Sequence, residues 1–197
     1  MEDGSIKVIN SLSHGTNEGV AYPKFWTAVL VQMNTEKRVA DKLNRLGIEN
    51  FVPVQTEIRQ WSDRKKKIDK VVIPMVVFVR IDKKTERILR TYSFIYKFIS
   101  YPGQKEAAII PEDQIDALKT MLNQSEASVE VCESVLKLGD VVEIIHGPLK
   151  GLIGELCYVE QGKPMVALRI DCLGYACVNV SKADIEVVNN QHSSNNN

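Results

Sequence analysis

Basic side chains gather at one short segment of this 197-residue chain, and their chemistry suits phosphate groups. Arg64, Lys65, Lys66 and Lys67 are followed by Lys70, so five positive charges fall within seven residues. Lysine and arginine neutralise phosphates and displace the counterions condensed on them. The same run is also typical of a solvated turn that keeps a sheet edge soluble. Both interpretations stay open for this candidate nucleic-acid-binding segment.

A second basic group falls on a segment with helical spacing, residues 82–93. This segment is lined by Lys83, Lys84, Arg87, Arg90 and Thr91, and its candidate nucleic-acid contacts are Lys84, Arg87, Arg90 and Thr91. Contacts to a nucleic-acid backbone need lysine or arginine, and Tyr92 or Tyr96 could stack on a base. A basic face is equally ordinary on a solvated helix, so residue type alone does not separate the two interpretations.

The chain lacks the residue patterns of common enzymes and metal sites. It has no G-x-S-x-G, Walker loop or H-E-x-x-H motif, and His146 has no evident catalytic partner. The cysteines form no C-x-x-C pair and have no histidine near them, which favours small buried thiols over zinc ligands: Cys132, Cys157, Cys172 and Cys177. We predict a protein that is not an enzyme and that needs no cofactor or metal.

Charge is divided unevenly along the chain, although 25 basic and 25 acidic residues cancel overall. Residues 1–125 hold 20 basic and 15 acidic side chains, and residues 126–197 hold 5 and 10. This asymmetry predicts two domains, of which the first faces a negatively charged partner. No apolar run reaches the roughly 20 residues of a membrane span, and the start of the chain is no signal peptide, so we expect a cytoplasmic protein.

Hydrophobic periodicity predicts an α+β sandwich with a mainly antiparallel sheet and the order βαββαβα over residues 23–124. Asn34 or Thr35 is expected to cap the first helix, and Gly47 to end it. The expected strands are 25–33, 49–61, 70–81 (central) and 94–103; the expected helices are 34–46, 82–93 and 111–123; and 62–69 is expected to be a charged turn.

The rest of the chain contains only strand patterns and polar segments. Residues 125–135 show no period and are expected to be a linker. Five short strands in 136–188 can close into a small SH3-like β-barrel. A flexible tail is expected at 1–22, and a disordered one at 189–197.

Turn-forming residues are concentrated in residues 136–156. Glycines there supply the dihedrals of a sharp reversal, and Gly154 lets one strand pass close to its neighbour. Leu149, apolar at the loop tip, is expected to fold back, and Lys150 to remain in solvent. The stretch resembles a KOW motif through Gly139, Asp140, Val142, Ile144, Gly147, Pro148, Leu149, Lys150, Gly151 and Gly154.

The upstream half resembles the N-terminal domain of NusG-type transcription elongation factors. The segments that carry this resemblance are "FWTAVLVQMNTEKRVADKL", "VVIPMVVFVRI" and "KFISYPGQKEAAIIP". Such a domain followed by KOW, over about residues 24–188, identifies the chain as similar to the NusG family. Met75 and Val76 stand where the family commonly has Gly-Tyr, and the chain ends its barrel with "DCLGYACVNVS". These departures resemble specialised RfaH-like paralogues of surface-polysaccharide operons rather than housekeeping members that contact Rho.

The resemblance implies a monomeric factor that suppresses pausing or termination. Its first domain would bind the clamp helices of the largest RNA polymerase subunits and touch non-template or upstream DNA, or nascent RNA. The KOW domain would recruit a further factor such as a ribosomal protein. An apolar patch is the candidate polymerase contact, although plain core is the alternative for these residues: Trp26, Ile73, Pro74, Met75 and Ile110.

A KOW-containing RNA-binding module of the translation machinery is the alternative function. Such a module needs a basic barrel, whereas residues 126–197 are acidic. The charge division therefore favours the transcription factor.

Overall fold

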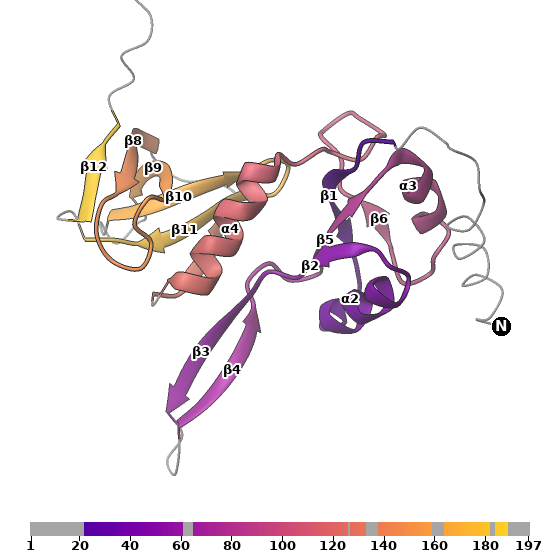
Figure 1. Cartoon of the computed structure of the whole chain (residues 1–197), viewed down its shortest axis with the longest axis horizontal. Helices are drawn as coiled ribbons and strands as arrows, with labels where there is room; N and C mark the ends of the chain where they lie inside the picture. Colours follow the sequence, from indigo (N-terminus) through magenta and orange to yellow (C-terminus); the bar gives the residue numbers. More distant parts are fainter. Residues whose placement is uncertain are drawn as a thin grey trace, which may run out of the picture. The chain divides into compact units, whose positions relative to one another are not determined.

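The structure is a computed structural model that describes residues 22–60, 65–125, 127–132, 138–158, 164–181 and 184–188. The chain forms two compact units (Figure 1). The first unit contains the chain up to Val52 and the segment Pro74–Ile109. The second contains Pro53–Ile73 and the chain from Ile110 onward. The polypeptide therefore leaves the first unit twice.

A four-stranded antiparallel sheet forms the centre of the first unit. Its order is β2-β5-β1-β6, with β1 at Phe25–Leu30, β2 at Glu49–Phe51, β5 at Val76–Ile81 and β6 at Lys97–Phe98. β1 and β5 pair from Phe25↔Ile81 to Leu30↔Val76. The apolar run at 76–81 thus lies between two strands, which confirms the predicted central strand over these residues. The prediction is wrong for 70–75, because Lys70 and Val71 pair within the hairpin described below and 72–75 form a bend and turn.

Two helices complete the first unit, α2 (Glu36–Arg45) and α3 (Lys83–Leu89). Val39 and Leu43 of α2 and Leu89 of α3 belong to the same buried cluster as Val77 and Val79 of β5. Gly47 has a φ of +69°, a conformation that glycine adopts at little cost, and this confirms the predicted helix end.

The start of α2 differs in detail from the prediction. Thr35 is the N-cap residue, but its side chain makes no cap hydrogen bond. The Thr35 hydroxyl instead donates to the backbone oxygen of Gln32 at 2.7 Å. The Thr35 hydroxyl therefore acts only as a donor to the preceding turn, and the backbone N–H groups of the first turn of α2 receive no hydrogen bond acceptor from it.

A two-stranded hairpin replaces the single strand and charged turn expected between residues 49 and 71. The long predicted strand breaks at Val52–Pro53, because proline cannot donate to a ladder. Beyond it, β3 (Val54–Gln60) pairs antiparallel with β4 (Lys65–Val71), from Val54↔Val71 to Gln60↔Lys65. The prediction of a turn over 62–69 is therefore wrong for 65–69, where ladder pairing outweighs the local preference of charged residues for turns.

The second unit also contains a helix and a six-stranded antiparallel sheet. Helix α4 (Glu112–Gln124) buries Ile115, Leu118 and Met121, as its spacing predicts. The sheet order is β12-β8-β9-β10-β11-β7. Its strands are β7 (Val129–Cys132), β8 (Leu138–Ile144), β9 (Ile153–Tyr158), β10 (Pro164–Ile170), β11 (Gly174–Asn179) and β12 (Ile185–Val187). The α+β class with antiparallel sheets is confirmed; closure into a barrel stays a prediction.

Strand β7 was not expected, because it lies in the segment 125–135 that shows no clear period. It pairs with β11 from Val129↔Val178 to Cys132↔Tyr175. The buried side-chain amide of Gln55 fixes its start: Oε1 accepts from the Val129 N–H at 2.8 Å, and Nε2 donates to the Ala127 oxygen at 2.8 Å. Strand pairing is thus decided by residues far away in the sequence. The division into domains and linker stays a prediction.

The glycine-rich loop between β8 and β9 has the expected features. Gly147 and Gly151 have φ values of +80° and +89°, which side chains rarely adopt. Leu149 is buried and Lys150 is exposed. A Cβ added at Gly154 would lie 2.5 Å from Val166 Cγ1 and 2.8 Å from the Ala167 oxygen. The sequence motif therefore corresponds to a tight reversal with close strand packing.

Gly154→Ala is expected to lower the free energy of unfolding by about 1–3 kcal/mol, because the extra methyl overpacks a site that holds a backbone oxygen. Thermal melting of the full chain checks this value. Lys150→Ala, at the exposed loop tip, is the control and should melt as the wild type does. A Gly154→Ala variant of unchanged stability would contradict the close strand approach.

Candidate functional site

The first candidate segment, the basic run at 64–67, lies on the hairpin. Arg64 falls outside the described residues. Lys65, Lys66 and Lys67 lie on strand β4, opposite Gln60, Arg59 and Ile58. Lys67 is exposed. A two-stranded ribbon with this register presents basic residues along a strand, and contact of these residues with nucleic acid stays a prediction.

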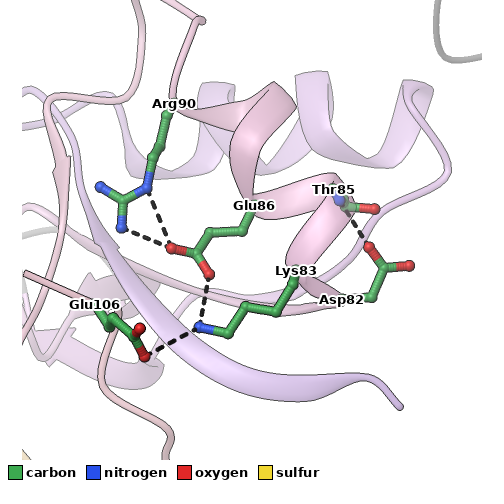
Figure 2. Close-up of polar contacts among 6 residues, drawn as sticks. All are labelled: Asp82, Lys83, Thr85, Glu86, Arg90 and Glu106. Atoms are coloured by element: carbon green, nitrogen blue, oxygen red, sulfur yellow. Dashed lines mark hydrogen bonds and ion pairs between the residues drawn. The ribbon is translucent and has the colours of Figure 1, made fainter. Parts of the chain in front are cut away.

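The second candidate group lies on α3, whose start is fixed by Asp82 (Figure 2). Its carboxylate accepts from the Thr85 N–H at 2.7 Å, which is a standard N-cap bond. One turn later the buried Glu86 lies between two cations: Lys83 Nζ is 3.2 Å away and Arg90 Nη2 is 2.6 Å away (Figure 2). Lys83 also lies 3.9 Å from Glu106.

These interactions change the acidity of Glu86. Burial by itself raises the pKa of a carboxyl group, but hydrogen bonds from Arg90 and Lys83, together with their charges, outweigh burial and hold the pKa of Glu86 below its ordinary value of 4.5. A carboxyl whose pKa is lower in the folded state stabilises the fold above its unfolded pKa. That contribution is lost as the pH falls through the folded pKa.

Glu86→Gln is therefore expected to destabilise the chain near pH 7 by about 1–3 kcal/mol, because an amide cannot make the three charge-assisted hydrogen bonds that the carboxylate accepts from Lys83 and Arg90. Near pH 3, below the ordinary pKa of a glutamate in the unfolded chain, the difference from the wild type should shrink, because proton binding by the unfolded state then removes part of the stability that the Glu86 carboxylate contributes. Melting curves of the variant and the wild type at both pH values measure this difference in stability. Glu106→Gln, at a carboxylate with an 84% exposed side chain, is the control and should have little effect. A pH-independent difference would contradict this account.

The network divides the basic residues of α3 into two sets. Arg90 and Lys83 are held by Glu86, and they also lie over the rings of Phe98 and Phe25 at 4.7 Å and 5.0 Å. The Thr91 hydroxyl donates to the Ile88 oxygen at 2.7 Å. Lys84 and Arg87 are exposed, and within the described parts of the chain no ion pair or hydrogen bond engages their side chains. Of the predicted set, these two are the most available to a phosphate.

A basic pocket of about 150 Å³ lies between α2 and the segment 93–96, and no sequence pattern indicated it. Lys42 Nζ lies 5.0 Å from the Phe94 ring centre, and Tyr96 is 57% exposed. The pocket thus combines cations with aromatic rings, the pairing used to hold single-stranded nucleic acid. Its lining residues are Gln32, Thr35, Arg38, Val39, Lys42, Ser93, Phe94 and Tyr96.

The five residues predicted as an apolar patch differ widely in exposure. Trp26, Ile73 and Ile110 are buried, with exposed fractions of 3%, 6% and 1%. Pro74 is exposed and Met75 is partly exposed. Direct contact with a partner is therefore available only to Pro74 and Met75 in this structure, and their binding role stays a prediction.

Met75 occupies an unusual backbone position. Its φ is +65°, in the left-handed region that favours glycine. Its N–H donates to Glu36 Oε1 at 2.8 Å, and its oxygen accepts from the Val31 N–H at 2.8 Å. Asn34 also donates to Glu36 Oε1, at 3.3 Å, and the adjacent Met33 is 56% exposed. We call Met33, Pro74 and Met75 the methionine corner.

Comparison with known proteins identifies the part of the chain that carries these features. Residues 24–119 match the family described as "Transcription termination factor nusG". These 96 residues, just under half of the chain, are similar to NusG. The methionine corner, the basic pocket, α3 and the described part of the hairpin all lie within this matched segment, whereas the KOW resemblance lies outside it.

Two solved structures match most of the chain at low sequence identity. "Domain interaction in Thermotoga maritima NusG" has 20% identity and a TM-score of 0.43, covering 84% of this chain and 98% of that one. "Crystal Structure of MjSpt4:Spt5 complex conformation B" has 17% identity and a TM-score of 0.27, covering 85% of this chain and 99% of that one. No curated protein matches the chain.

The residues that the structure describes contain no group of three or more His, Cys, Asp or Glu that could hold a metal ion. No helix among them is long and apolar enough to cross a membrane. Burial and the nearby Asp171 carboxylate raise the pKa of Cys172 to about 11, so this thiol stays protonated at neutral pH.

Proposed function

We propose that the protein is a non-catalytic transcription elongation and antitermination factor that binds RNA polymerase through its NusG-like segment. The family match over residues 24–119 is the observation that carries this proposal. Binding of one polymerase conformation shifts the population toward that conformation, which needs no catalytic residue. We assign the polymerase contact to the methionine corner, because adaptable methionines at an exposed site suit recognition.

The nucleic-acid contact is assigned to the NusG-like segment as well. Arg38 and Lys42 supply phosphate-binding charges beside the exposed Tyr96 ring, and Lys84 and Arg87 supply further free charge. Single strands are held by this combination of cations and stacking, without a requirement for base sequence. The non-template strand of an elongation complex is the partner that fits, and the hairpin lysines Lys65–Lys67 would meet nearby duplex.

The KOW-like part is proposed to recruit a further factor, such as a ribosomal protein, as the resemblance implies. Its acidic balance opposes direct binding of RNA. The left-handed backbone at Met75 occupies the position of the glycine that the family commonly has, so this departure changes a side chain at the corner and keeps its shape. That is consistent with a specialised, RfaH-like, cytoplasmic factor.

Pull-down of purified RNA polymerase by the full-length chain tests the function directly. We expect retention of the polymerase on the immobilised chain and fewer pauses in a single-round transcription assay. Binding of structured RNA without polymerase would instead support the alternative, a KOW-containing module of the translation machinery.

A further inference from the structure

One buried carboxylate joins two strained turns in the first unit. The described residues other than glycine that have positive φ are Asn34, Met75 and Cys172, at 62°, 65° and 63°. The backbone N–H groups of the first two both donate to Glu36 Oε1, at 3.3 Å and 2.8 Å. Glu36 is only 3% exposed. Two of these three positions therefore depend on the same oxygen atom.

The physical need for this oxygen is greatest at Met75. The left-handed region is energetically unfavourable for an L-residue with a Cβ atom, although asparagine tolerates it better than methionine does. Such a conformation persists only when surrounding interactions hold it. Here those interactions are the Glu36 bond to the Met75 N–H and the bond from the Val31 N–H to the Met75 oxygen. The backbone shape at Met75 thus depends on a side chain 39 residues earlier.

The carboxylate also connects the two segments that carry the exposed Met33 and the partly exposed Met75. Met33 lies beside Asn34, and Pro74 beside Met75, so one acceptor holds the backbone of both segments of the methionine corner. Leu30↔Val76 pairing places the ends of β1 and β5 together close by. A corner that is fixed before binding avoids the entropy of ordering it on contact.

We propose that Glu36 is a positioning residue: its carboxylate sets the methionine corner in the shape that contacts RNA polymerase. This inference rests on the proposed function. It assigns no contact with the polymerase to Glu36 itself, which is buried. It predicts that the acceptor oxygen matters and the negative charge does not.

Two substitutions separate the oxygen from the charge. Glu36→Gln keeps a side-chain oxygen acceptor, so binding of the full chain to RNA polymerase should stay within about twofold of the wild type. Glu36→Met keeps the length but leaves the partly buried Met75 N–H without its acceptor. We expect Glu36→Met to bind at least about tenfold more weakly, and its Met75 amide to lose protection from hydrogen exchange.

Glu86→Met is the matched control, since Glu86 is also buried, at 6% exposure, in the same unit. It should lower the melting temperature while leaving polymerase binding and Met75 amide exchange unchanged. Full binding by a folded Glu36→Met variant, or equal loss in both variants, overturns the proposal.

Two further results keep the test decisive. If Glu36→Met does not fold, it is combined with Met75→Gly, because glycine adopts the positive φ without help. A folded double variant supports the coupling between Glu36 and Met75, and an unfolded one overturns it. If the wild-type chain does not bind polymerase, the proposed function fails, and Met75 amide exchange alone decides whether Glu36 sets the corner.

Discussion

Met75→Glu is expected to abolish detectable binding to RNA polymerase, with an affinity lowered by about a hundredfold or more, while the chain remains folded. Met75 is partly exposed, so a carboxylate there keeps its water in the free protein. In an apolar interface the same carboxylate loses that water without gaining a partner, which costs several kcal/mol. This prediction is tested by measuring the affinity of the variant for surface-immobilised polymerase and its thermal melting by circular dichroism.

The same chain offers a matched control for this substitution. Ile109 belongs to the first unit and is 53% exposed, but it lies outside the methionine corner. Ile109→Glu should keep both stability and binding, whereas Met33→Glu should reproduce the loss at Met75. If Met75→Glu melts normally and binds at full affinity, the corner is not the polymerase contact. If it unfolds the chain, Met75 belongs to the core.

The second large effect is expected at the basic pocket. Reversing two charges with Arg38→Glu and Lys42→Glu should weaken binding to a single-stranded DNA oligonucleotide by about a hundredfold at low salt. It should also reduce the slope of log affinity against log salt by about 1.4, because each phosphate that is no longer neutralised removes about 0.7 from the slope. Fluorescence anisotropy over a range of salt concentrations gives both values.

Two comparisons make this result specific to the pocket. Lys24→Glu with Arg45→Glu changes the net charge of the chain equally at exposed residues that do not line the pocket. It should lower affinity much less. Tyr96→Leu keeps the charge and removes the exposed ring, so it should weaken binding by about tenfold with an unchanged salt slope. Equal losses in both charge-reversed proteins would mean that net charge, rather than the pocket, attracts the strand.

Much of the fold could be predicted because its signals are local. The apolar run at 76–81, the spacing of Val39 and Leu43, and the glycine at 47 each fix an element through neighbouring residues. Strand β4 could not be found this way, because its lysines become a strand only by pairing with β3. β7 was missed for the same reason: its partner β11 lies more than 40 residues later.

The candidate site was predicted less completely than the fold. Residue type places Pro74 and Met75 among the candidate contacts, but it does not show that they are accessible whereas Trp26 and Ile73 are buried. Glu36 resembles an ordinary acidic residue of a first helical turn, and only the structure shows its bonds to the amides of Asn34 and Met75. The pocket is formed by segments about 60 residues apart, so no single stretch of sequence reveals it.

The bond between Gln55 and β7 also sets the order in which the chain can fold during synthesis. The side chain of Gln55 can accept its hydrogen bond from the Val129 N–H only after Val129, which lies 74 residues later in the chain, has been synthesised. At about 5–20 residues per second, a ribosome needs about 4–15 seconds to make that stretch. The first unit ends at Ile109 and can be complete by then. The hairpin and its basic strand, by contrast, leave the ribosome long before their unit is finished, so a nascent chain exposes them to nucleic acid before the mature protein exists.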